Sequence, residues 1–310
     1  MAQQALAGRK QDTGPIGLVL TLIKKYWIVY TLVLPAVLFR FAFTAGPLLR
    51  TMWLSFTDKS LQRDGKFIGL ENYAYMFKDA YVQDSIDFTV IYTVTATVLQ
   101  VVLGLGMALL LNQNLKAQWF SRVANLLPWA AAPIVAGIMW RLMFFEGGGV
   151  LNDLVLRFDL HSERVMWLSD GKLARVSVIV TTLWKNSPWC ALVLLAGLKT
   201  IPVELMEAAQ VDGANVWARF IHITLPLLMP IILVVFLFRG MGEVGTFDQI
   251  LGLTRGGPGS ATEIISLYAF DRFFQHGRYG YGSALVMLLF LLTFLIGGFF
   301  ALLLYRRGQD

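Results

Sequence analysis

The sequence predicts an all-α membrane protein with six transmembrane helices. Of its 310 residues, 56% are hydrophobic and only 15% are charged, whereas soluble domains carry about 25% charged residues. The mean hydropathy is +0.62, and the apolar residues are gathered into long runs. A helix needs about 20 mostly apolar residues to cross the hydrocarbon of a bilayer. Six runs meet that length.

The six predicted spans are residues 27–49, 88–111, 123–145, 174–198, 226–250 and 281–305. The first follows basic residues, as in a signal peptide, but its apolar run is too long and no cleavage site of small residues follows it. We therefore expect a retained helix. The third span contains Pro128 and Pro133 and is predicted to be kinked, because proline removes a helical hydrogen bond. No repeat is visible, so we expect one membrane domain.

Basic residues beside the outermost spans predict that both termini are cytoplasmic. The Lys and Arg counts on the two sides are nearly equal, but Lys24-Lys25 and Arg306-Arg307 lie directly at span ends, where charge weighs most. The chain then divides into a cytoplasmic segment (1–26), a first helix (27–49), an extracytoplasmic loop (50–87), a five-helix core (88–305) and a cytoplasmic tail (306–310). Within the core, this topology places loops 146–173 and 251–280 outside and loops 112–122 and 199–225 in the cytoplasm.

Several classes of chemistry find no support in the sequence. The single cysteine, Cys190, excludes an intrachain disulfide and is predicted to be a buried small side chain. His161, His222 and His276 share no ligand spacing, so we expect neither a metal site nor a cofactor. The net charge of +6 is poor evidence for a nucleic-acid partner, because membrane proteins keep basic residues beside their spans. No phosphate-binding G-x-x-x-x-G-K-[ST] motif occurs, and the Gly-rich stretch RGGPGSAT (255–262) lacks its lysine. The chain is therefore not expected to hydrolyse ATP.

The loop 199–225 is polar and is predicted to form two short helices. Pro202 suits the first turn of a helix. Glu204 and Glu207 share one face near the helix N-terminus, where negative charge is favoured. Gly213 can end this helix, and a second helical stretch follows it. Two interpretations remain open at this point: a docking element for a partner, or an amphipathic linker that lies on the membrane surface without one.

Motifs in this loop resemble a known family. Glu207-Ala208-Ala209, then Gly213, then Ile223-x-Leu225-Pro226 resemble the EAA loop of binding-protein-dependent ABC importer permeases. The surrounding IPVELMEAAQVDGANVWARFIHITLPLLMP is close to the carbohydrate-uptake branch, which includes the maltose and glycerol-3-phosphate permeases. Four further stretches match in family order: FTDKSLQRDGKFIGLENY (56–73), LGLGMALLLN (103–112), FDQILGLTRGGPG (247–259) and YGSALVMLLFLLTFLI (281–296). The resemblance runs from about residue 30 to residue 305.

The resemblance implies a type I ABC importer permease fold in a bacterial cell (inner) membrane. It implies that the loop is a coupling helix seated in a groove of a cytoplasmic ATPase subunit, with Glu207 presented to that subunit and Gly213 forming the turn. Ala208 and Ala209 would allow a close approach. The full implied coupling set is Glu204, Glu207, Ala208, Ala209, Asp212, Gly213, Leu225 and Pro226. The implied partners are a second homologous permease subunit, two ATP-binding subunits and an extracytoplasmic solute-binding protein.

Polar groups inside two spans are the candidate substrate-binding residues. A charge within a span is costly, by about 2.5–3.5 kcal/mol on insertion scales, and is by default a functional candidate. The candidates are Lys185, Asn186 and Trp189 in span four, and Arg239, Glu243, Thr246 and Asp248 in span five. Residues 239, 243 and 246 follow helical spacing and so share one face, whereas Pro188 is expected to disturb the turn between Lys185 and Trp189. We expect one wet cavity between these spans, suited to hydroxylated ligands, and the resemblance places the family's substrate site in the same two stretches.

Structural interpretations stand beside these functional ones. Arg239 and Glu243 could form an internal ion pair that holds the bundle together, and this role is compatible with substrate contact. Arg141, near the outer end of span three, is predicted to reach for the membrane interface. A group of aromatic residues in the outer loop could dock a binding protein, or could anchor that loop at the membrane interface. These are Trp53, Tyr73, Tyr75, Phe77 and Tyr81.

The leading functional hypothesis is one half of an ATP-driven importer that brings in a sugar, a polyol or a sugar-like solute by alternating access. A related alternative is an importer for a non-carbohydrate solute such as a polyamine. A different class is a proton-coupled secondary carrier with Glu243 or Asp248 as its proton site. Dependence of uptake on ATP rather than on a proton gradient separates these classes. A membrane enzyme is the weakest interpretation, because no acid–base or nucleophilic constellation is visible.

Overall fold

The computed structural model describes the backbone of residues 15–113 and 118–307 and the side chains of residues 25–113 and 118–306. It divides into two units, residues 1–53 and 54–310, and each is considered by itself. The first unit contains α1 (Pro15–Arg40), a π-helical turn η1 (Phe41–Ala45) and most of α2 (Gly46–Ser55). Together they form a continuous apolar segment, Lys25–Ser55, that is long enough to span a membrane.

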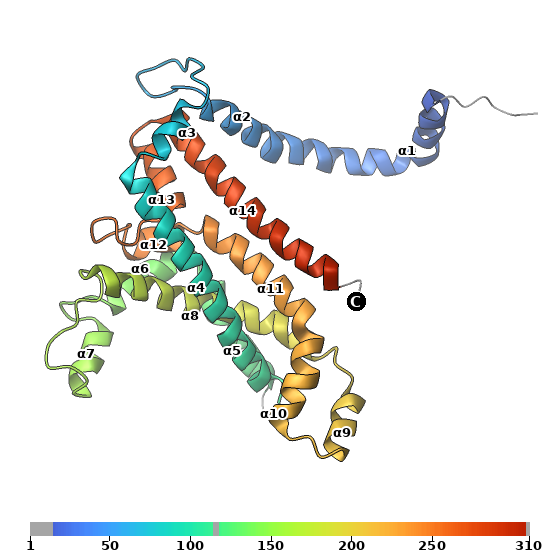
Figure 1. The fold of residues 1–310 in the computed structure, drawn as a ribbon, viewed down its shortest axis with the longest axis vertical. Coiled ribbons are helices and arrows are strands. Elements are labelled where there is room, and N and C mark those ends of the chain that lie inside the picture. Colours follow the sequence, from blue (N-terminus) through green and yellow to red (C-terminus); the bar gives the residue numbers. More distant parts are fainter. Residues whose placement is uncertain (1–14, 114–117, 308–310) are drawn as a thin grey trace, which may run out of the picture. The chain divides into compact units, whose positions relative to one another are not determined.

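The second unit is a helical bundle. Its elements are α3 (Glu71–Met76), α4 (Ala80–Leu111), α5 (Gln118–Ala130), α6 (Pro133–Met143), α7 (Val150–Arg157), α8 (Gly171–Leu198), α9 (Val203–Val211), α10 (Val216–Arg219), η2 (Phe220–Thr224), α11 (Leu225–Gly245), α12 (Asp248–Leu253), α13 (Ile265–Phe270), η3 (Asp271–Gln275) and α14 (Tyr279–Arg307). Helix α4 packs against α8 and α11, and α11 packs against α14 (Figure 1). The short helices α6 and α12 pack on each other beside this group.

All six predicted spans correspond to helices in the structure. Five are single helical segments, and the third is the pair α5–α6, which is bent by 92° at its break. The bend is sharper than the predicted kink. Its cause is Pro133, because the residue before a proline is pushed out of the helical region, and Ala132 is extended with φ −60° and ψ 137°. Pro128 lies inside α5 without ending it.

Two details of the predicted helices are wrong. Span five was expected to run to residue 250, but α11 ends at Gly245 and Thr246 is extended, with φ −67° and ψ 128°. Asp248 then begins the separate helix α12, so it does not lie on the face of α11. Pro188 was expected to disturb span four, but α8 continues through it. Prolines are tolerated in membrane helices where neighbouring helices and polar side chains satisfy the freed backbone groups.

The orientation of the termini stays a prediction. Residues 1–14 of the N-terminal segment, residues 114–117 of the loop 112–122 and residues 308–310 of the tail lie outside the described residues, as do the side chains of Lys24 and Arg307. The prediction for the cysteine is confirmed, since Cys190 is a buried free thiol. Among the residues that the structure describes, no three His, Cys, Asp or Glu side chains gather in a way that could hold a metal ion.

A cluster at the start of α4 ties three helices together. The Asp79 carboxylate accepts hydrogen bonds from the hydroxyls of Tyr268, at 2.7 Å, and Tyr281, at 2.8 Å. Burial alone would raise the pKa of Asp79, but these two hydrogen bonds and the Tyr81 N–H hold it below its usual value. Nearby, burial raises the pKa of Glu263 to about 7. The start of α4 is therefore fastened to α13 and α14 by an ionised carboxylate.

Small residues set the distance between α4 and α8. A Cβ atom added at Gly104 on α4 would lie 2.5 Å from the Cβ of Cys190 and 3.0 Å from the backbone nitrogen of Ala191, both on α8. Gly106, two residues further, faces open space. Small residues let membrane helices approach closely where hydrophobic burial between helices gives little driving force. Gly104 therefore fixes the packing of the two helices that flank the buried polar groups described below.

Gly104→Val should lower the thermal stability of the protein, because the added side chain overlaps α8 and overpacking costs about 1–3 kcal/mol. Gly106→Val is the matched control, since it carries the same change in helix propensity at an open position. Unfolding temperatures in detergent measure both variants. Equal unfolding temperatures for the two would contradict the close contact of α4 with α8.

Candidate functional site

A cavity of about 250 Å³ lies where α8, the end of α11 and the start of α12 meet. It lies between spans four and five, where the sequence predicts a cavity, but it does not take in all seven of the predicted residues. Five of the seven predicted substrate residues line it: Lys185, Asn186, Arg239, Thr246 and Asp248. The other two, Trp189 and Glu243, lie behind its wall. Pro133, at the start of α6, completes part of the lining.

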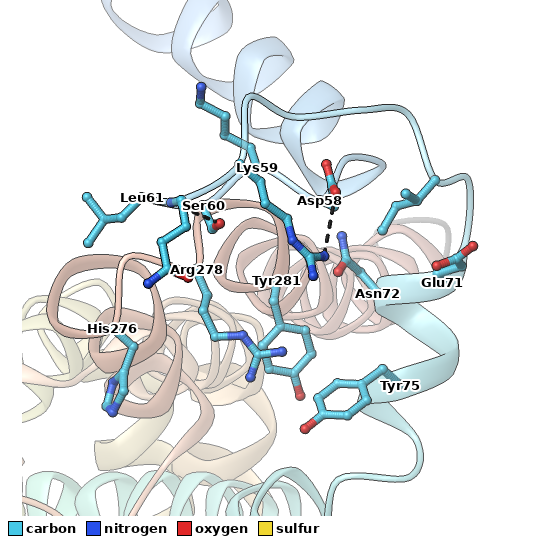
Figure 2. Close-up of a pocket in the computed structure, with 13 residues that line it drawn as sticks. Asp58, Lys59, Ser60, Leu61, Glu71, Asn72, Tyr75, His276, Arg278 and Tyr281 are labelled. Atoms are coloured by element: carbon cyan, nitrogen blue, oxygen red, sulfur yellow. Dashed lines mark hydrogen bonds and ion pairs between the residues drawn. The ribbon is translucent and has the colours of Figure 1, made fainter.

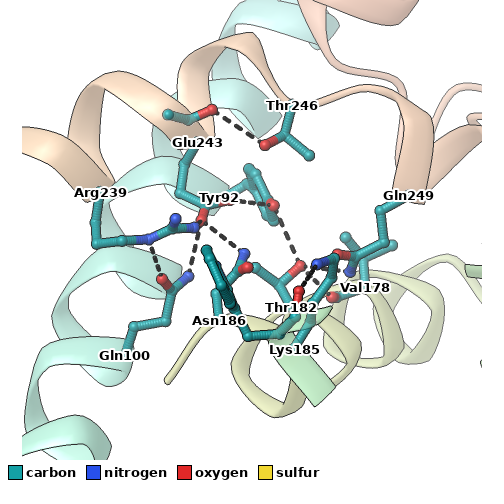
Figure 3. A network of polar contacts seen from close by, with 12 residues as sticks. Tyr92, Gln100, Val178, Thr182, Lys185, Asn186, Arg239, Glu243, Thr246 and Gln249 are labelled. Atoms are coloured by element: carbon teal, nitrogen blue, oxygen red, sulfur yellow. Dashed lines mark hydrogen bonds and ion pairs between the residues drawn. The ribbon is translucent and has the colours of Figure 1, made fainter. Parts of the chain in front are cut away.

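Glu243 is completely buried and is surrounded by hydrogen-bond donors (Figure 3). Its carboxylate accepts from the hydroxyl of Tyr92 at 2.5 Å, from the amide of Gln100 at 3.0 Å and from the amide of Asn186 at 3.2 Å. It also forms an ion pair with Arg239, one helical turn before it. A buried charge is tolerated only where it is paired and hydrogen-bonded. The internal ion pair considered from the sequence is thus present, within a larger network.

The network joins four helices. Tyr92 and Gln100 come from α4, Asn186 from α8, and Glu243 from α11. The hydroxyl of Tyr92 also lies 3.2 Å from that of Thr182 on α8, which in turn accepts a hydrogen bond of 2.9 Å from Gln249 on α12. Four of these residues were not predicted from the sequence: Tyr92, Gln100, Thr182 and Gln249. Of these, Gln100 could have been identified from the sequence, because it is a polar amide inside a long apolar run, where it needs a hydrogen-bond partner.

Arg239 is held at the cavity wall by three groups. Besides its ion pair with Glu243, its Nε donates to the side-chain oxygen of Gln100 at 2.7 Å. Its guanidinium carbon lies 5.9 Å from the centre of the Trp189 ring, which is cation–π distance. Trp189 therefore contacts Arg239 rather than the cavity. Three neighbours fix the guanidinium, and 14% of its side chain stays exposed.

Lys185 satisfies a backbone carbonyl that the broken span leaves free. In a continuous helix the carbonyl of Trp129 would accept from the N–H of residue 133, but that residue is Pro133, which has none. The Lys185 ammonium donates to this carbonyl at 3.1 Å. The same lysine lines the cavity and is only 6% exposed. One side chain thus stabilises the break between α5 and α6 and places a positive charge beside the cavity.

The cavity has balanced charge. Arg239 and Glu243 neutralise each other, which leaves Lys185 as one positive group and Asp248 as one negative group. Asp248 is exposed at the first residue of α12 and makes no ion pair with any described residue. The amide of Asn186 and the hydroxyl of Thr246 add uncharged donors and acceptors. A few convergent polar groups of this kind fix the orientation of a small ligand and give specificity.

The predicted coupling loop is a helix–turn–helix. Helix α9 begins after Pro202, carries Glu204, Glu207, Ala208 and Ala209, and is capped by Asp212. Gly213 follows with φ +82°, a left-handed conformation that favours glycine. The side chain of Asn215 then caps α10 by accepting from the N–H of Ala218 at 2.8 Å. Helix α11 starts at Leu225, with Pro226 in its first turn. Both glutamates are exposed on α9.

A second polar pocket, of about 530 Å³, lies between the loop after span one, helix α3 and the start of α14 (Figure 2). Backbone hydrogen bonds join its walls, from the N–H of Leu61 to the carbonyl of Gly277 at 3.0 Å and from the N–H of Gly280 to the carbonyl of Lys59 at 2.8 Å. The guanidinium of Arg278 lies over the rings of Tyr75 and Tyr281, at 5.3 and 4.9 Å from their centres.

This pocket, called the outer pocket below because the sequence predicts that its loops are extracytoplasmic, carries more positive than negative groups. Its cationic residues are Lys59, Arg63 and Arg278, and His276 adds a titratable ring. Its acidic residues are Asp58, which pairs with Arg63 at 3.6 Å, and Glu71. Of the aromatic residues predicted for this loop, Tyr75 lines the pocket, whereas Tyr73 packs on Phe56 and contacts Ser55 at 2.7 Å.

Glu243→Gln should lower protein yield and thermal stability sharply, because breaking a buried ion pair on one side costs about 3–5 kcal/mol. The double change Arg239→Met with Glu243→Leu should recover part of that loss, since no unpaired charge stays buried. Recovery should be incomplete, because the donors of Tyr92 and Gln100 lose their acceptor. Asp248→Asn, at an exposed acid of the same cavity, is the control and should keep the yield. Wild-type stability of Glu243→Gln would contradict the network.

Comparison with known proteins agrees with this architecture. Residues 100–308 match the family described as binding-protein-dependent transport system inner membrane component. The chain is 36% identical to the trehalose/maltose transport system permease protein MalF of Thermococcus litoralis, over 85% of this chain and 89% of that protein. It is 38% identical to the sulfoquinovosyl glycerol transport system permease protein SmoG of Agrobacterium fabrum, over 84% and 85%.

A solved structure shares the fold. A chain in the crystal structure of a bacterial ABC transporter for import of the acidic polysaccharide alginate superposes with a TM-score of 0.80, at 23% identity, covering 93% of this chain and 98% of that chain. This likeness confirms the predicted type I importer permease fold. With two thirds of its residues inside the family match and relatives above 30% identity over most of its length, the chain belongs to the inner membrane permease family of binding-protein-dependent ABC importers.

Proposed function

We propose that this permease subunit forms one half of a translocation pathway for a sugar, a polyol or a sugar-like solute. The observation that carries the proposal is the charge-balanced cavity lined by Lys185, Asn186, Thr246 and Asp248. A hydroxyl-rich, uncharged solute needs several hydrogen-bond donors and acceptors in a site without net charge. This lining offers donors and acceptors, and its charges balance. A relative whose name states trehalose and maltose as its solutes supports the same class, and sulfoquinovosyl glycerol, in the name of another, is a sugar derivative that carries an anionic group.

The two alternative solute classes fit this cavity less well. A polyamine carries several positive charges and needs several carboxylates, but here Arg239 and Lys185 face the cavity and Asp248 is its one accessible acid. A proton-coupled carrier needs a carboxylate that exchanges its proton with water. Glu243 is fully buried beneath four donor groups and does not line the cavity, so it has no contact with water there. Asp248 is the better candidate for that role, but it lies outside the network.

We also propose that the loop of α9 and α10 docks on a cytoplasmic ATP-binding subunit, with both termini of the chain on the same side. The loop presents Glu207 together with apolar side chains that none of the described residues cover, including Val211, at 88% exposure, and Trp217, at 68%. Exposed apolar groups beside a charge are typical of a protein contact surface. A second permease, two ATP-binding subunits and an extracytoplasmic binding protein would complete the transporter.

Glu207→Lys and Gly213→Pro should each abolish solute uptake while the protein stays in the membrane. The first reverses the charge offered to the ATP-binding subunit. The second forces φ to about −65° at a residue that adopts +82°, and so breaks the turn. Uptake of labelled solute and co-purification of the ATP-binding subunit are the measurements. Glu163→Lys, the same charge reversal at an exposed site in another loop, should transport normally. Normal uptake by both loop variants would leave α9 as a linker.

We propose further that the outer pocket receives an acidic side chain of the extracytoplasmic binding protein. Tyrosine and arginine are enriched at the energetic centres of protein interfaces, and Arg278 contacts two tyrosine rings and has no carboxylate partner among the described residues. The pocket's excess of positive groups favours an acidic partner. In this proposal, Tyr75 is the residue of the predicted aromatic group that contributes to docking, because its ring positions Arg278.

Arg278→Glu should raise the concentration of binding protein required for half-maximal stimulation of ATPase activity by about tenfold or more, because like charges then face each other across the interface. The unstimulated ATPase rate should stay unchanged. Arg157→Glu, at an exposed arginine of α7, provides the comparison. An unchanged response of Arg278→Glu to the binding protein would place docking elsewhere on the outer face.

A further inference from the structure

A groove of about 520 Å³ runs between α6 and α12, separate from the cavity and from the outer pocket. One part of its wall is apolar and the other is basic. The apolar part consists of Ile134, Ile138 and Leu251, and the polar part consists of Arg141, Arg255 and Gln275. No acidic residue lines it.

The two helices that form the groove are in tight contact. A Cβ atom at Gly252 would lie 2.5 Å from the carbonyl oxygen of Ile134, and one at Gly137 would lie 3.0 Å from the backbone nitrogen of Leu253. Glycine at both positions allows this approach, and the contact holds the two helices in one arrangement. The groove is therefore a fixed feature of the fold.

Both helices present the same order of residues to the groove. On α6, Ile134, Ile138 and Arg141 are spaced by four and three residues and share one face. On the other side, Leu251 lies in α12 and Arg255 follows four residues later, just beyond the helix end. In each case apolar residues precede an arginine at the C-terminal end. Each helix therefore has its arginine at the C-terminal end and its apolar groove residues before that end.

The two arginines have no counter-charge. Neither Arg141 nor Arg255 forms an ion pair or a side-chain hydrogen bond with any residue that the structure describes, and both are exposed. Arg255 also adopts φ +55°, a left-handed conformation that is uncommon for residues other than glycine, asparagine and aspartate. A lone arginine at a span end is explained by reaching for the membrane interface. A matched pair of arginines at one groove, one of them in an unfavourable backbone conformation, calls for a common ligand.

We propose that this groove binds an anionic phospholipid. The phosphate would lie between Arg141 and Arg255, with the amide of Gln275 as a further donor, and one acyl chain would lie along Ile134, Ile138 and Leu251. Planar guanidinium groups match the geometry of phosphate oxygens, and the apolar residues beside them match an acyl chain. A soluble anion would satisfy the arginines but would leave the apolar wall without a partner. The inference is independent of the solute that the permease carries.

The test uses the full-length chain purified together with the subunits that co-purify with it, stripped of lipid in detergent. Native mass spectrometry then follows the binding of phosphatidylglycerol and, separately, of uncharged-headgroup phosphatidylcholine. The test variant is Arg141→Gln with Arg255→Gln, and a second variant, Arg141→Lys with Arg255→Lys, keeps the charge. Arg157→Gln is the matched control, because this exposed arginine lies outside the groove.

We expect one phosphatidylglycerol to bind at least about tenfold more tightly than phosphatidylcholine. The glutamine variant should lose this preference, the lysine variant should retain part of it, and Arg157→Gln should match the wild type. Equal phosphatidylglycerol binding by the wild type and the glutamine variant would overturn the proposal. Displacement of the lipid by soluble glycerol phosphate at similar concentration would also overturn it, because the apolar wall would then contribute nothing. Loss of the second permease from the glutamine variant would assign the arginines to a subunit interface instead.

Discussion

The buried carboxylate of Glu243 is the group on which the arrangement of the bundle depends. It is fully buried, and a charge in that environment requires compensation by partners rather than by water. Those partners come from α4, α8 and α11 themselves: Tyr92, Gln100, Asn186 and Arg239. Three largely apolar helices are therefore placed in register by one carboxylate. Dispersion and hydrophobic contacts alone are tolerant of sliding, whereas hydrogen bonds to one group are directional.

Irregular backbone beside this network creates the cavity. Helix α11 ends at Gly245 and span three breaks before Pro133, so helical backbone is interrupted at two places near the same space. Free carbonyls within a membrane protein need a partner, and non-helical backbone is tolerated there where it lines a cavity. Lys185 provides the partner for one freed carbonyl. The residue that stabilises the break is thus the same residue that gives the cavity its positive charge.

The coupling loop is joined to the cavity by the chain itself. Helix α8 carries Lys185 and Asn186 and ends at Leu198, and α11 begins at Leu225 and carries Arg239. The loop of α9 and α10 lies between these two helix ends, so a displacement of α9 acts on both walls of the cavity. The network of Glu243 ties α8 to α11, which would make them move together. The proposed docking of an ATP-binding subunit and the proposed solute site are therefore mechanically connected by two rigid helices.

The six spans, the turn at Gly213 and the two short helices around it could be predicted from the sequence, because they depend on local quantities: the length of apolar runs, the lack of a Cβ in glycine, and a motif contiguous in the chain. Lys185 and Arg239 could also be predicted to lie beside one cavity, because a charged side chain inside a span is costly unless it lines a polar space. The partners of Glu243 could not be predicted, since Gln100 is 143 residues away along the chain and no spacing rule connects them. The same holds for the 92° bend of α5–α6 and the end of α11 at Gly245. Pro128 and Pro188 lie inside continuous helices, whereas the helix breaks before Pro133. The presence of a proline does not decide between these outcomes, because they depend on how the packed bundle satisfies the freed backbone groups.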